Sequence, residues 1–168
     1  MPADKYSNKA YISLTESAAN TLTFKELETG VSLFEKRAWI IHRIEYFIDN
    51  AAWAELLGAA DSLMLGLVLS NKITSLDLSD AAVIDLVKIN IGTAGTPASG
   101  FIGQSPRTRD FSTLPGGGHI VPPRPLYGAI NAGGFSAAAT SSIRFLYTAI
   151  EMKTEEYWEL VEAYRLVE

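Results

Sequence analysis

Apolar and polar side chains alternate along much of the chain, which is the two-residue period of a β-strand with one buried face. Within residues 10–15, Ile12 and Leu14 fall on one face, and the intervening positions carry Tyr, Ser or Thr. The same period recurs at 21–25 and at 62–69, where four leucines share one face. These three segments predict strands.

The segment 35–49, EKRAWIIHRIEYFID, fits two different periods. A helical period places Ile40, Ile41, Ile44, Phe47 and Ile48 along one stripe. A strand period places Ile40, His42, Ile44, Tyr46 and Ile48 on one face and Trp39, Ile41, Arg43, Glu45 and Phe47 on the other. We favour the strand because β-branched and aromatic residues fill the segment and no helix cap precedes it.

As a strand, this segment carries apolar residues on both faces. A two-layer domain usually leaves one of those faces polar. Large apolar patches rarely remain in contact with water. We therefore expect the second face to be covered, either by the terminal helix or by neighbouring copies of the chain.

The middle of the chain predicts shorter elements. Residues 51–61, rich in Ala, Leu and Glu, favour a short helical turn or part of a loop. Ser79 or Asp80 can cap a further short turn, because its first peptide N–H groups would otherwise lack partners. Residues 87–92 then look extended, and the Gly, Thr, Ser and Pro rich stretch from 92 to 109 predicts a long loop.

The last third of the chain predicts two strands and a helix. The strands are RPLYGAINA at 124–132 and SSIRFLYTAIEM at 141–152. The helix spans about 154–167, with an apolar stripe at the i, i+3, i+4, i+7 spacing. This stripe consists of Tyr157, Leu160, Val161 and Tyr164.

Together these elements predict an all-β fold, a jelly roll or β-sandwich of about eight strands with a C-terminal α-helix. An α+β sheet domain is the alternative. The chain has 168 residues, of which 48% are apolar and 20% charged, as in folded globular proteins. This length suits one domain, and no long linker divides the chain, so we predict a single domain at 1–168.

Charge and cysteine content narrow the possible partners. The net charge is -5, and residues 1–30 contain no basic arm that would neutralise phosphates, so direct nucleic-acid binding has no global support. The chain has no cysteine, which excludes disulfides and thiolate metal sites. We expect no signal peptide and no membrane span, because the apolar stretches are short and interrupted by polar residues.

Residues 112–130, STLPGGGHIVPPRPLYGAI, combine three consecutive glycines with His119 and four prolines. A phosphate-binding loop would need a lysine and then a helix, and both are missing here, so we predict a flexible connector. His42 and His119 are the only two histidines, too few for the usual metal-ligand sets. We predict His42 to be a satisfied polar group on a strand and His119 to lie in a loop, with no metal site, cofactor or catalytic residue.

Arg107, Arg109 and Arg124 lie in the predicted loop region and give it a local positive charge. Ordinary solubility or pairing between subunits is the simplest use of such residues. Contact with packaged nucleic acid is the alternative.

The rhythm of strands and loops resembles the single jelly-roll capsid proteins of small icosahedral viruses. Four parts of the chain carry the resemblance: the early strands YISLTES and NTLTFKEL, the strand AWIIHRIEYFI, the loop PGGGHIVPPRP, and the late pair PLYGAINA and SSIRFLYTAIEM. The resemblance implies a structural protein of the virion that assembles with copies of itself, and with other virion proteins, into an icosahedral shell. Many such proteins carry an Arg/Lys-rich amino-terminal arm, and this chain has none.

The resemblance further implies that loops 91–109 and 112–125 and the helix 154–167 adapt to contacts between subunits. The candidate contact residues are Phe101, Phe111, Trp158 and Tyr164.

Two competing functions remain open. An oligomeric β-sandwich could bind a carbohydrate or protein ligand, including as a viral decoration or spike protein, and Trp39, Trp53 and Trp158 are the available aromatic platforms. We expect two of these three to pack in the core. A cupin-like enzyme is the third class, and it lacks the closely spaced histidine pair that such enzymes ordinarily show.

Overall fold

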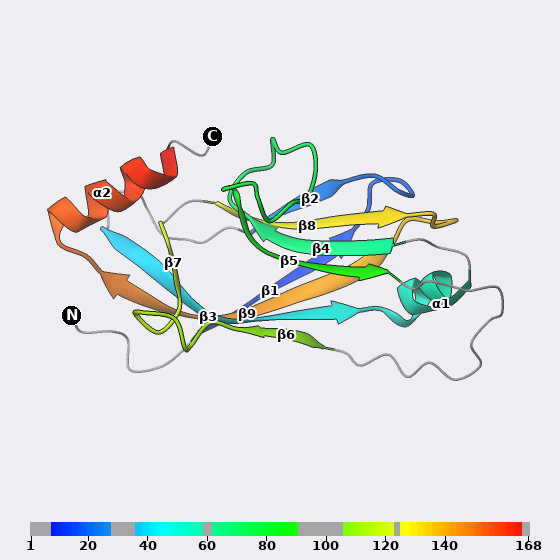
Figure 1. Cartoon of the computed structure of the whole chain (residues 1–168), viewed down its shortest axis with the longest axis horizontal. Helices are drawn as coiled ribbons and strands as arrows, with labels where there is room; N and C mark the ends of the chain where they lie inside the picture. The colour runs from blue at the N-terminus through cyan, green and yellow to red at the C-terminus, as the bar shows by residue number, and fades with distance from the viewer. Residues whose placement is uncertain (1–7, 28–35, 59–61, 91–105, 123–124, 166–168) are drawn as a thin grey trace.

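The computed structural model describes residues 8–27, 36–58, 62–90, 106–122 and 125–165 (Figure 1). Within these ranges there are nine strands and two helices. The strands are β1 (Asn8–Thr15), β2 (Thr23–Leu27), β3 (Arg37–Ile48), β4 (Ser62–Val68), β5 (Val83–Asn90), β6 (Arg107–Asp110), β7 (His119–Val121), β8 (Leu126–Gly133) and β9 (Thr140–Glu151). The helices are α1 (Asn50–Gly58) and α2 (Thr154–Arg165).

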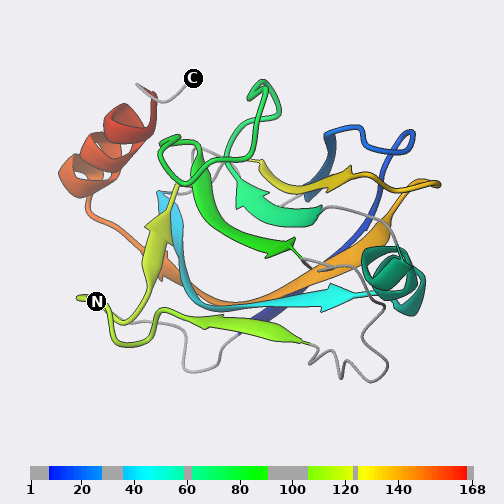
Figure 2. The ribbon, with the colours of Figure 1, turned by 45° about the vertical axis from the view of Figure 1, so that its right-hand side comes forward.

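The strands form two antiparallel sheets that pack face to face (Figure 2). The five-stranded sheet has the order β1-β9-β3-β6, and β7 pairs with β3. The four-stranded sheet has the order β2-β8-β4-β5. The prediction of an all-β sandwich with a C-terminal helix is thereby confirmed.

The pairing is that of one long hairpin rolled onto itself. β1 pairs with β9, β2 with β8, β3 with β6 and β7, and β4 with β5, so successive pairs are nested along the chain. Rolling then brings β9 against β3 and β8 against β4. If β6 and β7 are counted as one interrupted strand, this is the eight-stranded double Greek key of a jelly roll.

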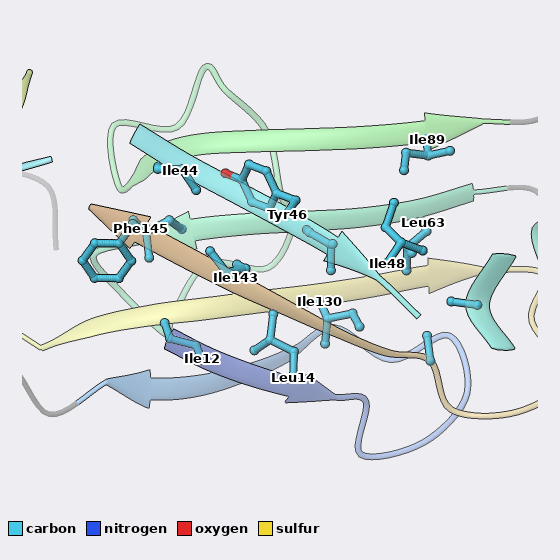
Figure 3. Close-up of a cluster of buried hydrophobic side chains, with 14 of the residues drawn as sticks. Ile12, Leu14, Ile44, Tyr46, Ile48, Leu63, Ile89, Ile130, Ile143 and Phe145 are labelled. Carbon is cyan, nitrogen blue, oxygen red and sulfur yellow. The ribbon is translucent and has the colours of Figure 1, made fainter. Parts of the chain in front are cut away.

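The core lies between the two sheets and is built from their inward faces (Figure 3). The five-stranded sheet contributes Ile12, Ile143 and Phe145, and the four-stranded sheet contributes Leu63 and Ile130. All of these side chains are at most 2% exposed. Fully burying a side chain of this size contributes about 1.5–3 kcal/mol, so the sandwich depends chiefly on this layer.

The leucines of 62–69 pack in this core, as their alternation predicts. Helix α1 is longer than the helical turn expected at 51–61. Figures 1 and 2 place α1 and α2 at opposite ends of the sandwich, so neither lies across the outer face of the five-stranded sheet. The terminal helix therefore does not cover that face, which was one of the two expectations.

The structure corrects the predicted alternation of side chains between the two faces of β3. The register of β3 against β9 shifts between Ile41 and Arg43, so His42 lies in a bulge. Trp39 and Ile41 before the bulge and Ile44, Tyr46 and Ile48 after it all belong to the same core cluster. The bulge moves the strand by one residue and keeps the large apolar side chains inside, so fewer of them reach the outer face than strict alternation predicts.

The glycine-rich stretch has a fixed structural role rather than that of a flexible connector. It forms the turn that joins β6 to β7, two strands that pair with β3 on either side of the bulge. Gly116 and Gly117 have positive φ values of 86° and 78°. A Cβ atom on Gly118 would lie 2.5 Å from the backbone oxygen of Ile41, so only glycine fits there.

Candidate functional site

A buried polar cluster lies where β5 and β6, the edge strands of the two sheets, approach each other. Asp85 pairs with Leu67 on β4, so its side chain shares the inward face of the sheet. Its two carboxylate oxygens accept different hydrogen bonds: Oδ2 from the Tyr46 hydroxyl at 2.8 Å and Oδ1 from Arg109 Nε at 3.2 Å. Asp85 is 2% exposed and Tyr46 is fully buried.

The electrostatics of this cluster favour a neutral Tyr46. Burial, followed by the neighbouring Asp85 carboxylate, raises the pKa of Tyr46 well above its ordinary value. The phenol therefore remains a hydrogen-bond donor. Because an unpaired buried carboxylate is costly, Asp85 needs both Tyr46 and the Arg109 guanidinium.

Arg107 and Arg109 lie on β6, which corrects their predicted position in a loop. They stand opposite Tyr46 and Ile44 on β3, so the two arginines share one face of the edge strand. The Arg109 side chain is 52% exposed, and its Nε atom is held by Asp85. Arg107 is exposed and forms no ion pair with any residue that the structure describes.

His119 lies on strand β7 and not in a loop, a second correction. Its Nε2 atom is 3.3 Å from the Tyr164 hydroxyl, which also donates to the Ile120 carbonyl at 2.8 Å. Burial lowers the pKa of His119, and the Asp85 charge partly opposes this. These contacts attach the end of α2 to β7.

His42 is a satisfied polar group on a strand, as predicted. Its Nδ1 lies 2.7 Å from the Gly117 carbonyl and its Nε2 lies 2.6 Å from the Thr148 hydroxyl. A carbonyl can only accept, so Nδ1 donates to Gly117. His42 therefore secures the glycine turn to the bulge of β3.

Glu16 is a further buried carboxylate and is 3% exposed. It accepts backbone N–H bonds from Ala132 at 2.7 Å and from Ala139 at 2.9 Å. Its own backbone N–H donates to the Ala139 carbonyl at 3.0 Å. Glu16 thus ties the end of β1 to the end of β8 and to the residue that precedes β9.

The predicted contact residues occupy different environments. Phe111 and Tyr164 pack against the core, whereas Trp158 is 56% exposed. Phe101 and Arg124 lie outside the described residues. The contact role of all five residues stays a prediction.

The tryptophans divide as expected. Trp39 and Trp53 are buried, at 4% and 9% exposure, and Trp158 alone of the three is exposed. Trp39 stacks on Tyr147, with ring centroids 4.1 Å apart. Two of the three potential platforms are therefore core residues.

Within the described ranges, no cluster of three or more His, Cys, Asp or Glu side chains has the arrangement to hold a metal ion. Neither described helix is long and apolar enough for a membrane span. Sequence reasoning missed Asp85 and Glu16. The available signal for Asp85 was a carboxylate at an inward position of the alternating strand Val83–Asn90.

No protein-family model matches the chain, and a comparison with curated proteins found no match.

Proposed function

We propose that the chain is a self-assembling structural protein, the capsid protein of an icosahedral virus, and that many copies close the shell of the virion. The observation that carries this proposal is the nested strand pairing, from β1 with β9 inward to β4 with β5. Jelly rolls of this kind occur in viral capsid proteins, lectins and cupins. Fold alone does not assign function, so the surface must supply the rest.

Large hydrophobic side chains are exposed at four separate places on the described surface, which supports contacts with neighbours on several sides. They are Tyr11 on β1, Leu78 between β4 and β5, Leu114 between β6 and β7, and Trp158 on α2. A subunit of a closed symmetric shell needs more than one contact surface. Repetition of modest contacts is then enough to hold the shell together.

The competing function is an oligomeric binding module, including a decoration or spike protein. The exposed indole of Trp158 favours it, because such a ring can serve as a platform for a sugar or a protein side chain. In that case a trimer or a monomer would be the finished assembly.

Electron microscopy of the purified chain separates the two functions. The capsid proposal expects closed particles of uniform diameter that contain tens of copies. Isolated trimers or monomers at every concentration and salt condition would contradict it. Absorbance at 260 nm relative to 280 nm of the same particles reports whether nucleic acid is enclosed.

A further inference from the structure

Helix α2 presents a charged outer face that the described residues leave unpaired. Glu155, Trp158, Glu159 and Glu162 follow the i, i+3, i+4, i+7 spacing, so they lie along one side of the helix. All four are exposed. None of the three glutamates forms an ion pair with a described residue.

The opposite side of α2 is the one attached to the sandwich. Tyr157 is 1% exposed, and Tyr164 bonds to β7. The rings of Tyr157 and Trp158 meet edge to face, with centroids 5.5 Å apart. Trp158 is therefore held at the centre of the acidic face by a buried neighbour.

The edge strand β6 presents the complementary charge. Arg107 has no carboxylate partner among the described residues, and Arg109 is fixed through Nε alone, so its two Nη groups remain available. The third charge on this strand, Asp110, is already paired with Arg43 at 3.3 Å. A guanidinium that is oriented before binding loses less side-chain entropy when it meets a carboxylate.

These two faces cannot satisfy each other within one chain. Figures 1 and 2 show α2 and β6 on different sides of the molecule. A second copy supplies the missing partners, because its own α2 carries carboxylates along one exposed face.

We propose that the outer face of α2 in one copy docks onto the β6 edge of the next copy. Trp158 forms the apolar centre of the contact, and the glutamates surround it and pair with Arg107 and Arg109. The contact joins two different surfaces, so it repeats from head to tail and closes into a ring when the rotation allows. This inference rests on the proposed self-assembly and names the surfaces that carry it.

Charge reversal tests the docking. Sedimentation velocity would compare the wild type with Arg107→Glu, Glu159→Arg and the chain carrying both changes. Each single reversal is expected to raise the concentration needed for assembly by about tenfold, because it places like charges together. The double variant restores assembly, since the pair is rebuilt with opposite polarity.

Matched variants control for net charge and for folding. Lys72→Glu in the β4–β5 loop and Glu26→Arg on β2 change exposed residues elsewhere and should leave assembly unchanged. Trp158→Ala should weaken assembly, whereas Lys9→Ala, at an exposed residue of β1, should not. Thermal unfolding of all variants at a concentration below assembly should match the wild type.

Two outcomes overturn the inference, and they are distinguishable. If the wild type assembles and both single reversals assemble equally well, the docking is wrong and the capsid proposal stands. If the double variant assembles no better than the single variants, the docking is again wrong and the capsid proposal stands. If the wild type never assembles, both proposals fail.

Discussion

Two of the buried carboxylates, Glu16 and Asp85, solve the same physical problem in different parts of the sandwich. Each has lost its water and needs hydrogen-bond donors in return. Glu16 takes its donors from the backbone, at Ala132 and Ala139. Asp85 takes its donors from side chains, at Tyr46 and Arg109.

The two sites differ in whether the donor residues are buried or reach the surface. The partners of Glu16 are buried alanine residues, so this corner contributes to stability alone. One partner of Asp85 is half exposed, so the buried charge fixes the direction of a cation at the surface. A carboxylate bonded to side chains can link the core to a surface contact, whereas one bonded to the backbone holds the fold.

The largest loss of stability is expected from substitutions of Glu16. Glu16→Ala should lower the free energy of unfolding by about 3–4 kcal/mol, because two buried N–H groups lose their acceptors. Glu16→Gln keeps one side-chain acceptor and should lose about half as much. Urea unfolding measures both, and a loss below about 1 kcal/mol for Glu16→Ala would show that water replaces the carboxylate.

Substitutions of Asp85 and Arg109 should lower the free energy of unfolding by less than Glu16→Ala does. Asp85→Ala should cost about 2–3 kcal/mol, since the buried Tyr46 hydroxyl loses its acceptor while Arg109 can turn to water. Arg109→Ala should cost about 1–2 kcal/mol, because the buried Asp85 carboxylate loses its cation but keeps the Tyr46 donor, and water can enter where the half-exposed guanidinium was. A double-mutant cycle on the pair gives the coupling, and a value near zero would mean that Asp85 does not orient Arg109.

The glycine turn holds β6 beside the Asp85 edge, and its three glycines should differ in sensitivity. Gly118→Ala should cost about 2 kcal/mol, because the added Cβ would overlap the Ile41 carbonyl. Gly116→Ala should cost about 1 kcal/mol, since only its positive φ opposes the change and nothing lies within 4 Å of the added atom. Equal unfolding midpoints for the two variants in urea would contradict this account of the turn.

The smallest effect is the pH dependence expected from His119 beside this edge. Burial lowers the pKa of His119 in the folded state, so the unfolded chain binds the proton more tightly. The contribution of His119 to the free energy of unfolding is therefore fully present above the ordinary pKa of histidine. It is lost as the pH falls through that pKa and then through the lowered pKa of the folded state. The Asp85 carboxylate opposes the loss, and Arg109, Tyr46 and Tyr164 surround the same region.

Lowering the pH from 7.5 to 5.5 should reduce the Tm by about 1–3 °C through His119. His119→Gln removes the titrating ring and should flatten this part of the curve. Differential scanning calorimetry of both proteins across the window measures the difference. Parallel curves for the wild type and the variant would exclude His119 as the source.

The period-two pattern predicted the strands where each strand has one buried face. It failed at β3 because a bulge changes which residues share a face. The sequence carried a signal for this: the buried positions Ile41 and Ile44 lie three positions apart, with the polar pair His42 and Arg43 between them. β6 carried no such signal, because all four of its residues are exposed on an edge strand.

The polar cluster could be predicted only in part. A carboxylate at an inward strand position indicates a buried partner, but the partner cannot be named from the sequence. Tyr46, Asp85 and Arg109 come from β3, β5 and β6, and only the rolling of the hairpin brings them together. The sequence alone indicated a local positive charge at Arg107 and Arg109, whereas their common face on one strand depends on the register with β3.

Self-assembly is the claim on which the functional account depends, and sedimentation velocity of the wild type over a range of concentrations tests it most directly. The account predicts a fast, uniform boundary for particles of tens of copies, which dissolves as salt screens the exposed ion pairs. A single boundary for the 18.2 kDa monomer at every concentration would contradict it.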